Sequence, residues 1–386
     1  MTQDTFSITY TAVHPGTDKT DIVFCGDTDS HAFADAYAPG KSAEPRLFVT
    51  DETVASLPLL KDFTAAFTQE PPRAGKTYLS GNDALLVLGA GEPYKTIESV
   101  LAIIRAALEN NLQRSSVFTG IGGGVVCDMT AFAASLFKRG ARLELVPTTL
   151  LAMVDAAVGG KTGCDFEAYK NMIGTFYPAA RLRMYSEFIP LLPESEYRSG
   201  LAETVKTGLL YAPKLFDILE RQKDAVMRRD TDVVRQLIKR CVIAKANIVE
   251  KDLTETGLRM QLNFGHTFAH ALETCAGLGT VSHGDAVGWG MARALDLSHR
   301  LGLCSAEYRD EVCAVLASYG WETAPVHSAL SGSGRTAAQT AAALIEAMKK
   351  DKKNTPGAIR CILQRDMNST VVQEAAEADI AAVLGA

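Results

Sequence analysis

The chain has 386 residues, of which 47% are hydrophobic and 22% charged, and its formal net charge is −6 at pH 7. This length is enough for two ordinary domains, each with its own core. The acidic balance argues against nucleic acid as a partner, and no apolar run is long enough to predict a membrane span. The eight cysteines are scattered with no CxxC pair, which predicts reduced thiols and a cytoplasmic protein.

The first half of the chain alternates short apolar runs with helical patterns. Four runs that end in turn residues predict buried strands, at 46–51, 83–92, 115–124 and 142–149. Helical periodicity lies between them, over 95–111 and 125–140. This alternation predicts an α/β domain with a mostly parallel sheet covered by helices on both faces.

The second half is mainly helical. The predicted helices cover 195–225, 230–252, 256–275, 284–302, 308–319 and 336–350, and a short strand pair near 358–364 and 369–374 precedes a final helix. Prolines at 178, 190 and 193 lie around the change of pattern. We therefore predict an N-terminal α/β domain over residues 1–186 and a mainly α-helical domain over residues 187–386.

Four predicted strand ends carry residues suited to a dinucleotide. Glycines 122–124 stand where a strand turns into a helix, so the backbone there can approach a pyrophosphate at the helix N-terminus. The run is not GxGxxG, and an ordinary tight turn explains it equally well. Glu92 and Lys95 follow a second strand, and the hydroxyls of 148–149 follow a third. Asp51 ends another strand, where an acid either binds a ribose or caps the next helix.

Histidines are concentrated near residue 270. Three of the seven, His266, His270 and His283, fall within 18 residues. Arg259 and Asn263 precede the first two at helical spacing, so a single helix over 256–275 would place these polar side chains on one face. Such a stripe suits neither a core nor a random surface, and it indicates a metal site.

A metal site needs a further ligand, and a carboxylate is the best candidate. Glu203 shares a predicted helix face with Lys206, three residues later. Two histidines and one carboxylate form a zinc site that keeps open positions for substrate oxygens. Alone, Glu203 would be read as an ordinary surface acid.

A glycine-rich segment over 154–174 is predicted to be a loop. It contains Asp155, Lys161, Lys170 and Asn171 among small residues. Further positive charge comes from Lys245, Arg259 and the run at 348–354. Several lysines together with a metal stripe indicate a small substrate with two anionic groups.

By its motifs the chain resembles the dehydroquinate synthase family of the sugar-phosphate cyclases. The segments that carry the resemblance occur in the family's order and are GEPYKT, GGGVVCD, FKRG, PTTLLAMVD, VGGKTG, KNMIG, GLAETVK, GLRMQLNFGHTFAHALE and SHGDAVGWGM. They cover about 85–300, and a DKK segment follows. Two departures stand out. The Lys-Asn pair, which usually follows Pro-Leu-Gly, here ends the segment CDFEAYKN. Tyr185 stands where a strand usually ends in aspartate.

The resemblance implies a role for individual residues. The implied ligands of zinc or cobalt are Glu203, His266 and His283. The implied substrate contacts are Asp155, Lys161, Asn171, Lys206, Lys245, Arg259, Asn263, His270 and Lys352. The implied NAD contacts are Asp51, Glu92, Lys95, Gly123, Gly124, Asp128, Thr148, Thr149, Lys161 and Lys170. Arg139 would reach the active site of a second subunit, so the resemblance also implies a homodimer.

The implied reaction converts a phosphorylated seven-carbon sugar acid, 3-deoxy-D-arabino-heptulosonate 7-phosphate, to 3-dehydroquinate. It combines transient oxidation by NAD, phosphate elimination, re-reduction, ring opening and aldol closure, as a step of the shikimate pathway. The alternatives are a cyclase of sedoheptulose 7-phosphate, glucose 6-phosphate or an aminated analogue, a metal-dependent polyol dehydrogenase, and a non-catalytic NAD-binding regulator. The retained Gly159-Gly160-Lys161 and His270 favour the carboxylated substrate.

Overall fold

The structure is a computed structural model, and it describes residues 4–10, 17–42, 44–167, 169–277, 279–349 and 358–386. It separates into two compact units: unit 1 comprises Met1–Pro193 and Val234–Thr254, and unit 2 comprises Glu194–Val233 and Glu255–Ala386. The domain division predicted from sequence places the break a few residues earlier and keeps 234–254 with the helical part. That division stays a prediction.

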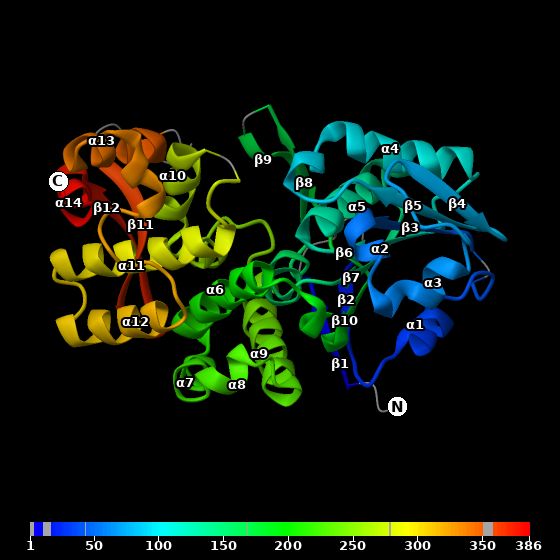
Figure 1. Ribbon diagram of the computed structural model, residues 1–386, viewed down its shortest axis with the longest axis horizontal. Coiled ribbons are helices and arrows are strands. Elements are labelled where there is room, and N and C mark those ends of the chain that lie inside the picture. The colour runs from blue at the N-terminus through cyan, green and yellow to red at the C-terminus, as the bar shows by residue number, and fades with distance from the viewer. Residues whose placement is uncertain (1–3, 11–16, 43, 168, 278, 350–357) are drawn as a thin grey trace. The chain divides into compact units, whose positions relative to one another are not determined.

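The core of unit 1 is an eight-stranded sheet in the order β1-β2-β10-β7-β6-β3-β5-β4 (Figure 1). The six inner strands run parallel, and β1 and β4 pair antiparallel at the two edges. The strands are β1 (Asp4–Thr9), β2 (Lys19–Cys25), β3 (Arg46–Asp51), β4 (Lys76–Ser80), β5 (Asp83–Leu88), β6 (Val117–Gly122), β7 (Arg142–Pro147) and β10 (Arg181–Tyr185). The predicted mostly parallel sheet is confirmed.

Helices cover both faces of this sheet, with α4 and α5 on one side and α1 and α3 on the other (Figure 1). Phe48 of β3 packs against Tyr37 and Phe63, with ring centroids 6.1 and 5.1 Å apart, which fills the layer beneath α1 and α3. The helices of unit 1 are α1 (Ser30–Tyr37), α2 (Glu52–Ala55), η1 (Pro58–Leu60), α3 (Lys61–Ala65), η2 (Glu92–Tyr94), α4 (Ile97–Glu109), α5 (Gly124–Leu136), η3 (Phe137–Arg139), η4 (Ala152–Ala156), η5 (Ser186–Leu191) and most of α9 (Thr231–Val249). Burial on both faces explains the continuous apolar strands.

The segment over 154–174 is not a loop, so this prediction was wrong. After the π-helical turn η4, the chain forms a hairpin of β8 (Lys161–Phe166) and β9 (Tyr169–Phe176). Gly163 and Gly174 are partners in this hairpin, and an added Cβ on Gly174 would lie 2.1 Å from a backbone oxygen. The glycines therefore permit close approach of two strands.

Unit 2 is mainly helical and ends in a two-stranded sheet. Its elements are α6 (Glu194–Tyr211), α7 (Pro213–Arg221), α8 (Lys223–Met227), η6 (Leu258–Asn263), α10 (His266–Ala276), α11 (His283–Arg300), α12 (Ala306–Ser318), η7 (Ser328–Ser333), α13 (Ala337–Lys349), β11 (Ala358–Asp366), β12 (Ser369–Ala376) and α14 (Glu377–Val383). The predicted helix over 195–225 breaks before Pro213, because a residue that precedes proline avoids helical geometry. Among the described residues, no helix has both the length and the apolar character needed to cross a membrane.

The predicted single helix over 256–275 was also wrong. The 3-10 helix η6 ends at Asn263, and α10 begins at His266 after a turn through Gly265. Gly265 has a left-handed φ of +80°, and an added Cβ would lie 2.8 Å from the backbone nitrogen of Met291. The close approach of α11 thus requires glycine, and the turn separates Arg259 and Asn263 from the histidine helix.

Candidate active site

Three predicted metal ligands come together in unit 2. Glu203 of α6 is fully buried, and its Oε1 lies 3.5 Å from Nε2 of His266 and 3.3 Å from Nε2 of His283. One ligand atom of each residue lies within 4.8 Å of the other two. Each histidine is the first residue of its helix, α10 or α11. The helix starts therefore position both rings beside Glu203.

Both imidazole rings are oriented by acceptors on their other nitrogen. Nδ1 of His266 lies 3.2 Å from the carbonyl oxygen of Phe264, and Nδ1 of His283 lies 3.4 Å from Oε1 of Glu273. Burial lowers the pKa of His266 well below its ordinary value. Burial also opposes the charge of His283, but contacts with Glu203 and Glu273 raise the pKa of its ring to about 9. A basic imidazole is a strong ligand, and a metal displaces its proton.

The donor set fits a divalent metal. Apart from an ion pair with Lys206, the carboxylate of Glu203 has no hydrogen-bond partner of good geometry among the described residues. A carboxylate without solvent is costly unless cations face it. Two imidazole nitrogens and one carboxylate are the donors typical of zinc sites with open positions, and they also suit cobalt.

Other predicted residues of unit 2 lie on the same elements. Lys206 is 2% exposed and Arg259 is 1% exposed. The side-chain amide of Asn263 donates to Oε1 of Glu255 at 2.5 Å. The exposed ring of His270 lies 5.4 Å from that of His266, between ring centroids. The buried cations are suited to neutralise an anionic ligand.

Sequence reasoning missed two acids of this unit, Glu255 and Glu273. Glu273 lies seven residues after His266, so the two share a face of α10. Extending the polar stripe of α10 beyond His270 would have found Glu273. Glu255 precedes the turn into η6, and its contact with Asn263 follows no sequence periodicity.

In unit 1, five predicted residues form one polar cluster. Lys95 is 6% exposed, and its Nζ lies 2.7 Å from Oδ2 of Asp128 and donates to Oδ1 of Asn171 at 2.6 Å. Nζ of Lys170 lies 3.9 Å from Oε1 of Glu92. Burial opposes the charge of Lys95, but Asp128 and Glu92 raise the pKa of this lysine, which therefore stays protonated. The cluster joins α5 to the β9 strand.

The N-terminus of α5 lies beside this cluster and fits a pyrophosphate. Gly123 is its N-cap, and among the described residues no side chain caps the helix. A Cβ on Gly122 would lie 2.5 Å from Cβ of Val126, and one on Gly123 would lie 3.1 Å from Cγ2 of Thr149. Gly122 therefore leaves no room for a side chain, and the N–H groups at the start of the helix can hold phosphate oxygens.

A separate ion pair in unit 1 joins two predicted substrate contacts. Nζ of the buried Lys245 donates to the carbonyl oxygen of Asp155 at 2.5 Å and pairs with its carboxylate. The π-helical turn η4 presents Asp155 after β7. Thr148, a predicted NAD contact, is buried directly after the same strand.

The remaining predicted residues are more dispersed. Oδ1 of Asp51 accepts a hydrogen bond from the backbone N–H of Val54 at 2.8 Å, so this acid caps α2, and a ribose contact stays a prediction. Lys161 is exposed at the start of β8, and Arg139 is exposed at the end of η3. Lys352 lies outside the described residues.

Together the fold and the site define a metal-dependent enzyme with a nucleotide-binding sheet. The family model described as 3-dehydroquinate synthase N-terminal matches residues 85–199, and the model described as 3-dehydroquinate synthase C-terminal matches residues 200–354. A 3-dehydroquinate synthase from Acidithiobacillus ferrooxidans is 39% identical over 337 residues, which cover 87% of this chain and 86% of that protein. The chain belongs to the 3-dehydroquinate synthase family.

Solved structures share the fold. ValA, a 2-epi-5-epi-valiolone synthase from Streptomyces hygroscopicus subsp. jinggangensis with NAD+ and Zn2+ bound, is 27% identical, with a TM-score of 0.78 over 97% of each chain. A 2-deoxy-scyllo-inosose synthase complexed with carbaglucose-6-phosphate, NAD+ and Co2+ is 20% identical, with a TM-score of 0.77 over 99% of each chain. The second likeness concerns the fold alone.

Proposed function

We propose that this chain is a 3-dehydroquinate synthase that uses NAD and a zinc or cobalt ion. Its substrate would be 3-deoxy-D-arabino-heptulosonate 7-phosphate, and its products would be 3-dehydroquinate and phosphate. The observation that carries the proposal is the cluster of His266 and His283 around the buried Glu203 in a chain of this family. Phosphate release from the heptulosonate phosphate, assayed with NAD and zinc, tests it directly.

The metal site, NAD and the buried cations supply different parts of the chemistry. Bound at these sites, a divalent metal supplies Lewis acidity at a substrate hydroxyl, and NAD supplies a reversible hydride acceptor. Lys206 places a buried positive charge beside Glu203, and Arg259 adds a second cation in the same unit. In unit 1, Lys245 is a further buried cation, paired with Asp155. Fixed cations of this kind stabilise carboxylate and phosphate oxygens as charge develops.

The same cations weigh against a polyol dehydrogenase. Buried cations form charge-assisted hydrogen bonds with carboxylate and phosphate oxygens, which a neutral polyol does not have. Lys206 and Arg259 are each at most 2% exposed. The carboxylated substrate therefore explains the site better than a neutral one.

We expect catalytic amounts of NAD to support many turnovers without accumulation of NADH. A cyclase returns the hydride in each cycle, whereas a dehydrogenase releases NADH. The measurement follows phosphate release and the absorbance of reduced nicotinamide in the same reaction. Stoichiometric NADH release would move the chain to the dehydrogenase class.

Glu273→Gln should weaken metal binding roughly 10–100-fold, because a carboxylate that accepts from a ligating imidazole fixes the ring and raises its basicity. The contact concerned is the 3.4 Å approach to Nδ1 of His283. Competition with a chelator measures the metal affinity, and NAD affinity serves as a second readout that should not change. Glu311→Gln, at an exposed position of α12, is the matched control. Unchanged metal affinity in the Glu273 variant would contradict this role.

We further propose a cytoplasmic homodimer. The eight cysteines are thiols, with no disulfide among the described residues, which suits a reducing compartment. Arg139 is exposed next to the exposed Leu136, where it can reach a second subunit.

A further inference from the structure

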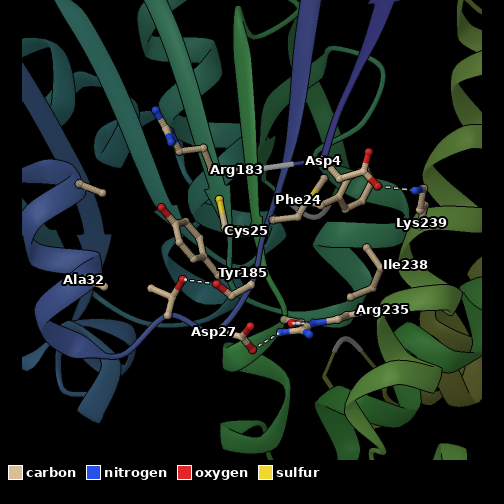
Figure 2. A pocket seen from close by; sticks show the side chains of 15 residues that line it. Asp4, Phe24, Cys25, Asp27, Ala32, Arg183, Tyr185, Arg235, Ile238 and Lys239 are labelled. Atoms are coloured by element: carbon tan, nitrogen blue, oxygen red, sulfur yellow. Dashed lines mark hydrogen bonds and ion pairs between the residues drawn. The ribbon is translucent and has the colours of Figure 1, made fainter. Parts of the chain in front are cut away.

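Unit 1 contains a cavity of about 450 Å³ at the carboxyl ends of β2 and β10 (Figure 2). Its lining comes from β1, β2, β10, α1 and α9 and the turn after β2. None of the residues assigned above to NAD, metal or substrate lines it. A volume of this size is typical of small-molecule sites.

One wall of the cavity carries a polar cluster of Cys25, Arg183 and Tyr185. Tyr185 is the direct neighbour of Cys25 in the parallel pairing of β10 with β2, and Arg183 lies two residues earlier on the same face. Figure 2 shows these three side chains on the side of Ala32, away from Phe24 and Lys239. Tyr185 is 3% exposed, and the cavity provides its access.

The other charged residues of the lining are compensated within the cavity wall. Lys239 pairs with Asp4. Arg235 lies 3.3 Å from Asp27 and 3.1 Å from Glu187, measured between guanidinium nitrogen and carboxylate oxygen. Asp4, Asp27, Arg235 and Lys239 of the lining therefore carry no net charge together, and Glu187, outside the lining, adds a second acid beside Arg235.

Arg183 differs from them. Among the described residues no carboxylate forms an ion pair with it, and its buried Nε has no hydrogen-bond acceptor. Glu144 acts on Arg183 only through its charge, and it forms its ion pair with Arg181 instead, at 3.4 Å between Nη1 and Oε1. The guanidinium lies 5.8 Å from the ring centroid of Tyr37. The cavity thus has one uncompensated positive charge.

We propose that this cavity binds a small organic carboxylate, held by the guanidinium of Arg183 and the hydroxyl of Tyr185, with the rest of the ligand beside Ala32 and Ala36. The planar fork of arginine matches a carboxylate, and a buried charge is stabilised only by a partner of opposite sign. A single cation suits a monoanion better than a phosphate dianion. Tyr185 brings no carboxylate to the cluster, so Arg183 stays available for this ligand.

Cys25 provides a reporter for the site, because its half-buried thiol lies in the same cluster. The full-length protein is alkylated with iodoacetate or with the neutral, nearly isosteric iodoacetamide, and peptide mass spectrometry gives the rate at each cysteine. We expect the iodoacetate-to-iodoacetamide rate ratio at Cys25 to exceed the ratio at Cys275, which is also half-buried, by about tenfold. Equal ratios at the two cysteines would overturn the proposal.

Two variants test the residues. Arg183→Gln removes the cation and Tyr185→Asp supplies an internal carboxylate, so each should reduce the ratio at Cys25 to that at Cys275. Arg181→Gln, on the same strand but outside the lining, should leave it unchanged. The ratio at Cys275 within each variant and its thermal unfolding report whether the chain is folded. A high ratio that survives both cavity substitutions would exclude Arg183 as the anchor.

A non-covalent probe separates the ligand classes. Benzoate at millimolar concentration should slow the reaction of Cys25 with iodoacetamide in the wild type and not in Arg183→Gln. Inorganic phosphate should protect Cys25 less than benzoate does. Stronger protection by phosphate would overturn the assignment to a carboxylate, and these outcomes do not depend on the catalytic activity of the chain.

Discussion

Replacing His266 with alanine should abolish metal binding and turnover together. The variant keeps only Glu203 and His283 as metal ligands. The fully buried carboxylate of Glu203 then has the imidazole of His283 beside it but not that of His266. Loss of a direct ligand should weaken metal binding by more than the roughly 10–100-fold expected for a hydrogen-bond partner of a ligand. Metal content after dialysis and phosphate release from the heptulosonate phosphate are the two measurements.

The control for this experiment is His31→Ala, at an exposed position of α1, which should retain both metal and activity. Binding of NAD by the His266 variant reports whether unit 1 is still folded. Full metal occupancy in His266→Ala would show that the ligand set is wrong, whatever the activity of the variant.

The sheet could be predicted from the sequence because its strands are buried on both faces. Such strands have continuous apolar runs, and β5 and β6 are buried along their whole length. Helix α4 was equally clear, because Thr96 caps its start and the apolar period is regular. A local sequence pattern is enough to predict an element when the burial of its residues follows a simple period along the chain.

The two failed predictions have a common cause. Gly163 and Gly174 in the hairpin were read as loop glycines, whereas Gly265 before α10 was taken as an interior residue of a continuous helix. Their positions are set by contacts with other segments, where a Cβ would clash with neighbouring backbone. A glycine that is required by close approach cannot be told from a loop glycine in a single sequence.

The candidate site was only partly accessible for a similar reason. Spacing predicted that residues of α10 share a face, but not that Lys95, Asp128 and Asn171 meet, because three separate elements bring them together. Asp51 shows the limit of single residues: the structure shows a helix cap, and nothing in the sequence separates that role from a ribose contact.

Arg259→Ala should lower kcat/KM for 3-deoxy-D-arabino-heptulosonate 7-phosphate by on the order of a hundredfold or more. A hydrogen bond to a charged group contributes about 1.5–3 kcal/mol net, and an arginine fork makes more than one such bond to a carboxylate. Arg259 is 1% exposed, so its charge acts without solvent screening. Arg259→Lys should recover part of the loss, because it restores the charge but not the fork.

A matching experiment removes the carboxylate from the substrate instead of the arginine from the protein. Sedoheptulose 7-phosphate lacks the carboxylate, so the wild type should turn it over poorly or not at all under the same zinc and NAD. Phosphate release is compared for both substrates in the wild type, in Arg259→Ala and in Arg221→Ala, a control at an exposed position of α7. Metal content of each variant separates a lost substrate contact from a damaged site. Preference of the wild type for sedoheptulose 7-phosphate would exclude the dehydroquinate reaction while leaving the metal and NAD proposals standing, because neither depends on the carboxylate.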